Sequence, residues 1–261
     1  MAAAAAAEKP AAVPKRLLVV EGSDLFRRKL LAALKGLEGV KFEVAVEAGA
    51  AAEALAASGA PWNLLLVDLH LPPGPQGDFL ETLRASPSPG RAPLLGMVGM
   101  VGLPDLLQLV AGLTPVGLLD KAQPADDLRA AIATALAPAA AAPIAPLGTT
   151  GLTVRCTLGR TDLKGLLVGL GPGGARVAVP EVPAADSALT LMFILPEVPH
   201  LFQVAGRVTN REWPGPGAAL GTIDVKFADL DAEARSRILA FLLVDARRRG
   251  VARTAEIGKT P

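Results

Sequence analysis

The chain has 261 residues, of which 51% are hydrophobic and 20% are charged, and its formal net charge is +1. This length favours two domains, each large enough to bury its own core, and the composition is typical of globular rather than disordered or collagen-like proteins. The near-neutral charge argues against a dedicated nucleic-acid binder, which needs a clustered basic excess.

The cysteine and histidine content restricts disulfide and metal chemistry. The one cysteine, Cys156, can form no intramolecular disulfide and no thiolate metal site, which favours a reducing, cytoplasmic location. The histidines are His70 and His200 alone, so zinc and copper sites are not expected.

Two segments could be mistaken for targeting or membrane elements. Residues 1–7 are alanine-rich and lack the basic start and apolar centre of a signal peptide, so residues 1–14 are expected to be a disordered tail. Residues 92–119 are the most hydrophobic region, but Pro104 and Asp105 divide them into pieces too short to span a bilayer. We interpret this region as buried strand plus helix.

A linker divides the chain. Residues 138–148 read PAAAAPIAPLG, without charge and with several prolines, so they are not expected to form a core or continue a helix. The predicted organisation is a first domain at residues 15–137, a linker at 138–149, a second domain at 150–249 and a tail at 250–261.

Apolar β-type runs alternate with segments of helical period before the linker. The predicted strands are residues 16–20, 42–46, 63–68, 93–98 and 116–119, and the predicted helices are residues 24–37, 50–57, 78–85, 104–111 and 125–136. This alternation predicts an α/β domain built on a doubly wound, five-stranded parallel sheet. Functional groups are expected at the carboxyl ends of its strands.

Short strands separated by Gly, Pro and Asp turns follow the linker. The predicted strands are residues 152–156, 165–170, 175–179, 189–195, 202–210 and 220–227. A helix is expected from Asp231, a plausible N-cap, to about Arg248, with basic residues near its end. The pattern predicts an antiparallel β-barrel with a closing helix.

Three segments of the first domain carry a family resemblance. LLVVEGSDLFRRKL places Glu21 after the first strand, LLLVDLHLPP places Asp68 at the end of the third, and GLLDKAQPADDL places Lys121 after the fifth. Together they resemble the receiver domain of response regulators over residues 15–137. The resemblance implies a pocket in which Asp68 is the candidate phosphoryl acceptor and Glu21 and Lys121 are its neighbours.

The pocket departs from the receiver pattern where metal binding and signal readout are concentrated. Phosphoryl transfer to a carboxylate needs Mg²⁺ held by nearby carboxylates and a lysine that neutralises the acyl phosphate. The departures are Gly22 for the second acid, Val98 for the Ser or Thr, Leu118 for the switch aromatic and Ala122 for the proline after the lysine. We therefore interpret the domain as a pseudo-receiver in which Mg²⁺ binding is weak or absent. In the alternative without any phosphoryl chemistry, Asp68 and Lys121 form a weak surface ion pair, and His70 is a surface-loop residue.

The second domain resembles the PilZ family over residues 150–246. The resemblance rests on GLLVGLGPGGARVAVP, ALTLMFILP, VAGRVTN and LGTIDVKFADLDAEARSRILAFL. PilZ domains that bind cyclic di-GMP use an R-x-x-x-R motif and a D-x-S-x-x-G motif. Here Gly169 and Gly171 replace the Asp and Ser, Gly174 matches, and Arg155 and Arg160 are five residues apart. Cyclic di-GMP binding is not expected, and residues 171–174 are interpreted as a tight turn rather than a phosphate loop.

Two functions from different classes follow from these resemblances. The first is a non-enzymatic bacterial signalling protein that acts through a protein partner or a homodimer, in motility, polarity or exopolysaccharide control. The second is an effector gated by cyclic di-GMP or by phosphorylation. An enzyme is not expected, because no paired acids, activated nucleophile or ligand cluster is apparent. The partner surface is expected on the face of the fourth strand, its helix and the fifth strand, through Leu106, Leu109 and Val110. The C-terminal arginines are too few to predict membrane contact.

Overall fold

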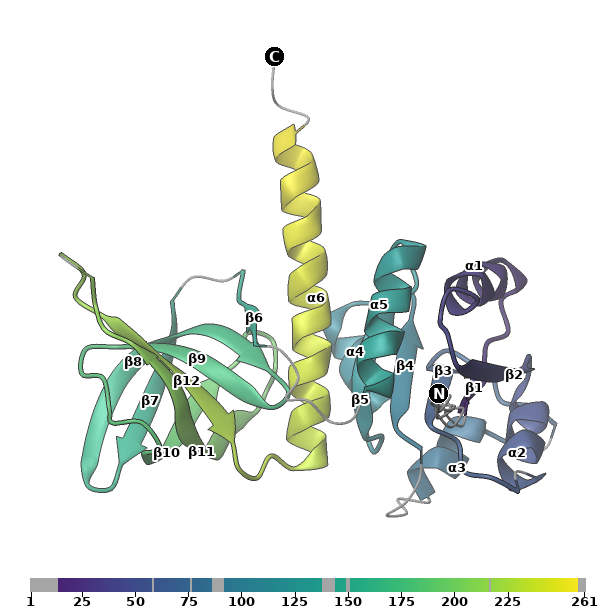
Figure 1. The fold of residues 1–261 in the computed structure, drawn as a ribbon, viewed down its shortest axis with the longest axis horizontal. Coiled ribbons are helices and arrows are strands. Elements are labelled where there is room, and N and C mark those ends of the chain that lie inside the picture. The colour runs from purple at the N-terminus through teal and green to yellow at the C-terminus, as the bar shows by residue number, and fades with distance from the viewer. Residues whose placement is uncertain are drawn as a thin grey trace, which may run out of the picture.

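The computed structural model describes residues 14–57, 59–75, 77–85, 92–137, 144–148, 151–215 and 217–257, with side chains up to residue 250. Figure 1 shows a helical and parallel-sheet part, a β-barrel, and one long helix that stands between them. The tail predicted at residues 1–14 lies outside the described residues except for Pro14.

A five-stranded parallel sheet forms the centre of the first part, in the order β2-β1-β3-β4-β5. Its strands are β1 (Lys15–Val20), β2 (Val40–Ala45), β3 (Leu64–Asp68), β4 (Leu94–Val98) and β5 (Pro115–Asp120). Strands β3 and β4 are buried along their whole length, which explains their apolar runs. The order and the parallel pairings confirm the predicted doubly wound sheet.

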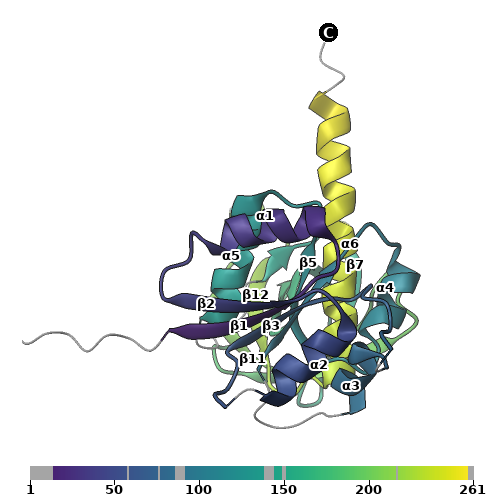
Figure 2. The same cartoon turned by 90° about the vertical axis from the view of Figure 1, so that its right-hand side faces the viewer.

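Helices cover both faces of this sheet (Figure 2). Helices α1 (Asp24–Leu34) and α5 (Ala125–Leu136) share a hydrophobic core with one face. Helices α2 (Ala48–Ala57), α3 (Phe79–Ala85) and α4 (Leu103–Val110) belong to the core of the other. The hydrophobic region at residues 92–119 thus contains β4, α4 and β5, as predicted. Among the described residues, no helix combines the length and hydropathy that crossing a membrane requires.

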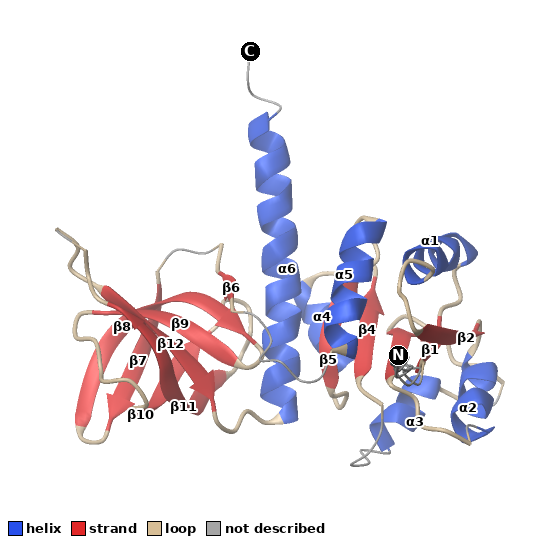
Figure 3. Cartoon of the chain, in the orientation of Figure 1, coloured by secondary structure: helices blue, strands red, loops and turns tan. Residues whose placement is uncertain are grey.

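The second part is a closed antiparallel barrel, as predicted. Its strands are β7 (Leu152–Leu158), β8 (Thr161–Gly171), β9 (Gly174–Val179), β10 (Ala188–Ile194), β11 (Leu201–Glu212) and β12 (Gly221–Phe227). They follow the order β8-β7-β10-β11-β12-β9, and β8–β9 pairing closes the ring (Figure 3). Buried and exposed residues alternate over the first eight residues of β11, Leu201 to Val208, so every second side chain there faces the interior. There the rings of Phe193 and Phe202 stack with centroids 5.0 Å apart.

A short strand lies within the predicted linker. Strand β6 (Ala145–Pro146) pairs with Leu170 and Gly169 of β8. The neighbouring Leu147 packs against the barrel core, so apolar contacts hold this end of the predicted linker on the barrel. Residues 138–143 lie outside the described residues.

Helix α6 (Ala232–Ile257) contacts both parts of the molecule. The side chains from Ile238 to Val244 are mostly buried, because the helix lies against α4 and β5 on one side and the barrel on the other. The helix continues beyond its predicted end at about Arg248. A glycine such as Gly250 costs a helix only about 1 kcal/mol relative to alanine, and the alanines, arginine and glutamate that follow favour helix.

Candidate functional site

The three predicted pocket residues meet at the carboxyl edge of the parallel sheet. Glu21 follows β1, Asp68 ends β3 and Lys121 follows β5, so parallel pairing brings them together. The Lys121 Nζ atom lies 2.7 Å from Asp68 Oδ2 and 2.8 Å from Glu21 Oε2. The contact with Glu21 Oε2 is an ion pair without the geometry of a hydrogen bond. One ammonium group therefore lies between two carboxylates.

The other carboxylate oxygens accept backbone hydrogen bonds. Glu21 is fully buried, and its Oε1 accepts from the amide of Ser23 at 2.8 Å. Asp68 is also buried, and its Oδ1 accepts from the amide of His70 at 3.0 Å. The Lys121 ammonium also lies 5.2 Å from the centre of the Phe26 ring, a cation–π contact. Each carboxylate thus accepts one backbone hydrogen bond and shares the Lys121 charge, and Glu21 Oε2 takes part through the ion pair.

The donor set does not fit the divalent cation of the receiver family. Mg²⁺ prefers an octahedron of oxygens, and the second acid of the receiver pattern is Gly22 here. The two remaining carboxylates face Lys121, whose charge opposes a cation at the same place. Among the residues that the structure describes, no group of three or more His, Cys, Asp or Glu could hold a metal ion.

The positions that read out phosphorylation in receivers carry apolar side chains here. Val98 is fully buried, and its carbonyl accepts a 2.9 Å hydrogen bond from the Lys121 amide. The Leu118 side chain lies over Gly96 beside Leu69. His70 is exposed, with its ring Nδ1 3.9 Å from Asp68 Oδ1, which agrees with its interpretation as a surface-loop residue.

A buried charge beside the pocket was missed from the sequence. Asp120, the residue before Lys121, is buried, and its Oδ2 accepts a 2.5 Å hydrogen bond from Arg247 Nε of helix α6. Arg247 also donates to the carbonyls of Gly99 at 2.8 Å and Val101 at 3.1 Å, in the loop after β4. The C-terminal arginines suggested only a helix end, since no local pattern links residue 247 to residue 120.

The expected exposed patch on α4 is wrong. Leu106 and Val110 are fully buried or nearly so, and Leu109 packs against the same core. Helix α6 of the same chain covers the face formed by α4 and β5, which we call the α4–β5 face. Helix α4 has few polar side chains because it packs on the sheet on one side and on α6 on another.

The barrel positions that correspond to the cyclic di-GMP motif are crowded. A Cβ atom at Gly169 would meet Ile144 Cγ2 at 2.9 Å and the Ala145 carbonyl oxygen at 3.2 Å, because β6 lies against this strand. At Gly174 it would meet the Val225 carbonyl oxygen at 2.6 Å. Residues 171–174 form the predicted tight turn, in which Gly171 pairs with Gly174 between β8 and β9. Arg155 lies exposed within β7, and Arg160 lies exposed in the turn that follows.

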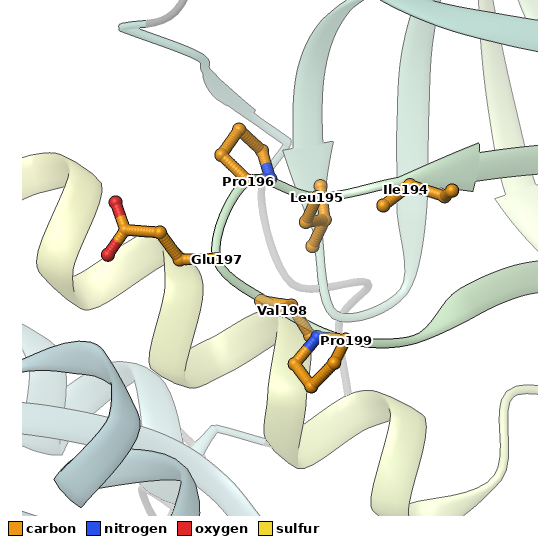
Figure 4. A pocket seen from close by; sticks show the side chains of 6 residues that line it. All are labelled: Ile194, Leu195, Pro196, Glu197, Val198 and Pro199. Carbon is orange, nitrogen blue, oxygen red and sulfur yellow. The ribbon is translucent and has the colours of Figure 1, made fainter.

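A hollow of about 530 Å³ lies at the β10–β11 turn, beside α6 (Figure 4). It is lined by Ile194, Leu195, Pro196, Glu197, Val198 and Pro199. Glu197 points toward α6, where its carboxylate lies 2.8 Å from Arg248. Its lining carries one charged side chain, already paired, so the hollow offers few groups for a polar ligand.

The comparisons with known proteins concern mainly receiver domains. No protein-family profile and no curated protein matches the chain. A signal receiver domain of a putative Luxo repressor protein from Vibrio parahaemolyticus is 20% identical, with 47% of this chain and 90% of that chain covered and a TM-score of 0.39. The chemotaxis response regulator CheY4 of Vibrio cholerae is 18% identical, with 47% and 98% covered and a TM-score of 0.38.

A structure of the inhibitor of motility MotI/DgrA from Bacillus subtilis is also similar. It is 16% identical, with 42% of this chain covered and a TM-score of 0.34. This chain covers 52% of that chain, about half of its length.

Proposed function

We propose that this chain is a non-enzymatic, cytoplasmic signalling protein of bacteria that acts through contact with a protein partner. In this proposal a pseudo-receiver and a PilZ-like barrel work together as an adaptor. The observation that carries it is the position of Lys121, which lies between Asp68 and Glu21 in a pocket that has no third acid. Control of motility, polarity or exopolysaccharide is the process that the two resemblances suggest.

The pocket geometry supports a role without phosphoryl transfer. An incoming phosphoryl group brings negative charge toward Asp68 and Glu21, and receivers offset this charge with a metal ion. Here the cation that pairs with both carboxylates is Lys121, and Gly22 adds no ligand. The incoming charge is therefore poorly compensated.

The barrel geometry supports a role without cyclic di-GMP. Charge-assisted contacts to phosphate and guanine each contribute roughly 1.5 to 3 kcal/mol, and the motif residues that would make them are absent. At Gly169 the space for an Asp side chain is filled by Ile144 and Ala145. Losing several such contacts lowers affinity by many powers of ten.

The second candidate is an effector gated by phosphorylation or cyclic di-GMP through non-standard residues. One observation favours it, because Asp68 and Lys121 keep a 2.7 Å contact at the strand ends where receivers place these residue types.

A calorimetric titration of the full chain with cyclic di-GMP distinguishes an adaptor without ligand from an effector whose barrel binds cyclic di-GMP. The adaptor role predicts no saturable heat at micromolar protein concentration, and the Arg155→Ala/Arg160→Ala variant should give the same trace. A dissociation constant below about 10 µM that the double variant weakens would overturn the ligand-free proposal in favour of the gated effector.

A further inference from the structure

Helix α6 covers the face on which a partner of the first part was expected. The buried residues of α6 belong to one continuous hydrophobic cluster that includes α4 residues on one side and barrel residues on the other. Leu106 and Val110 contribute to this cluster, so the apolar side chains of the α4–β5 face are already occupied within the chain.

Polar contacts tie the two ends of this interface. Near the start of α6, the buried Ser236 hydroxyl donates a 2.9 Å hydrogen bond to the carbonyl of Leu113, in the loop between α4 and β5. Eleven residues later, roughly 16 Å along a helix, Arg247 binds Asp120 and the loop after β4. The apolar contacts lie between these two polar ties.

The Arg247 contact is connected to the pocket through the backbone. Asp120 and Lys121 are consecutive, and the Asp120 side chain binds α6 while the Lys121 side chain binds Asp68 and Glu21. The loop at Gly99 and Val101 leaves β4 at the same sheet edge as Asp68. The guanidinium of Arg247 therefore fixes the loop after β4 and the end of β5, both beside the pocket, to helix α6.

We propose that α6 is an autoinhibitory element that occupies the α4–β5 face, and that the Arg247 contact with Asp120, Gly99 and Val101 holds it there. A partner of this face has to displace α6 first. The Arg247 and Asp120 side chains are 12% and 8% exposed, so the contact is shielded from salt and breaks mainly when α6 moves. The inference rests on the proposed function in one respect, namely that the chain acts through a protein partner, and it adds that this partner uses the α4–β5 face.

Hydrogen exchange of the full chain, followed by mass spectrometry, tests the inference without any partner. Arg247→Ala is expected to speed amide exchange at residues 99–113 by about tenfold or more, because it frees the loop after β4 and leaves Asp120 uncompensated. Strand β1 in the first part and strand β10 in the barrel should gain less exchange than residues 99–113, because only the latter lose a direct contact in addition to the global destabilisation. Arg248→Ala is the matched control, since Arg248 is adjacent on α6 but pairs with the exposed Glu197.

Two further variants keep the test decisive. If Arg247→Ala fails to fold, Asp120→Asn replaces it in the test. This substitution preserves the shape of the side chain and removes its charge, so it should also increase exchange at residues 99–113. Arg247→Lys should give an intermediate increase, because a lysine cannot make the same set of directed hydrogen bonds. Unchanged exchange at residues 99–113, or an equal increase in β1 and β10, would overturn the inference. Either result would leave the proposed function standing, because the cyclic di-GMP titration is independent of α6.

Discussion

Gly22 is the residue whose replacement should change the pocket chemistry most. A Cβ atom at Gly22 would lie 3.4 Å from the Val46 carbonyl oxygen and 3.9 Å from Leu71 Cδ1, which is ordinary contact. Gly22→Asp is therefore expected to fold and to add a third carboxylate beside Glu21 and Asp68. We expect millimolar MgCl₂ to raise the melting temperature of this variant and not that of the wild type or of Gly22→Asn. An equal response of all three proteins would contradict the poor fit of the native pocket to Mg²⁺.

Gly169 should resist restoration of the cyclic di-GMP motif. Because Ile144 and Ala145 occupy the space beside it, Gly169→Asp is expected to lower the free energy of unfolding by about 1 to 3 kcal/mol, the usual cost of overpacking. Gly173→Asp, at a position in the next turn with open space, should have a much smaller effect. Urea denaturation of both variants makes the comparison, and similar losses would show that β6 does not restrict this strand.

Cys156 should be unreactive while the barrel is folded. Burial raises the pKa of its thiol to about 11. At pH 8 about 0.1% of the thiol is then ionised, and the thiolate is the reactive form. A raised pKa means that folding disfavours the thiolate, so this group reduces stability as pH rises above the pKa of the unfolded thiol. A chromogenic disulfide reagent should label Cys156 slowly in native protein and rapidly in urea, whereas labelling at the rate of a free thiol at pH 8 would show that the site opens.

Among the contacts between elements, the ion pair of Arg247 in α6 with Asp120 in β5 is expected to have the largest effect on stability. Removing one member of a buried charge pair costs about 3 to 5 kcal/mol, because the other charge stays buried without compensation. Arg247→Ala should approach this cost, and Arg247→Ala/Asp120→Ala should lose less than the sum of the single variants. Equilibrium urea denaturation gives the coupling. Additive losses would show that the two side chains do not stabilise each other.

Local sequence patterns were sufficient to predict most elements. The strands of both parts follow from apolar runs and turn residues, and the predicted bounds differ from those of the structure by a few residues. The three pocket residues followed from the resemblance of their segments to receiver domains, and the structure places them at strand ends, where they meet. The end of α6 was misplaced because the sequence around Gly250 contains a helix breaker whose cost is small. The paired strand β6 was read as linker, because two residues of pairing leave no periodic pattern.

The relation between the two parts could not be predicted, because it depends on contacts between residues far apart in the chain. Arg247 and Asp120 are 127 positions apart, and the segment GLLDKAQPADDL, which contains Asp120, gives no sign of a contact with the last helix. The apolar character of α4 was recognised, but its burial beneath α6 is visible only in three dimensions. Residues 238–244 of α6 are apolar around most of the helix circumference, which fits their burial between the two parts.

The whole molecule should unfold as one unit, because the core runs from the first part through α6 into the barrel. Trp62, buried in the first part, and Cys156, buried in the barrel, provide separate probes. In a Trp213→Phe background, the fluorescence of Trp62 and the reactivity of Cys156 should change at the same urea concentration. Midpoints that differ would show that the two parts unfold independently.

Treatment of the full chain with acetyl phosphate and Mg²⁺, followed by intact-mass spectrometry, tests the central claim most directly, that the protein signals without phosphoryl transfer to Asp68. We predict that the mass of the wild type stays unchanged, because the pocket lacks a third acid and Lys121 already pairs with both carboxylates. The gain of one phosphoryl group, absent from Asp68→Ala, would contradict the claim.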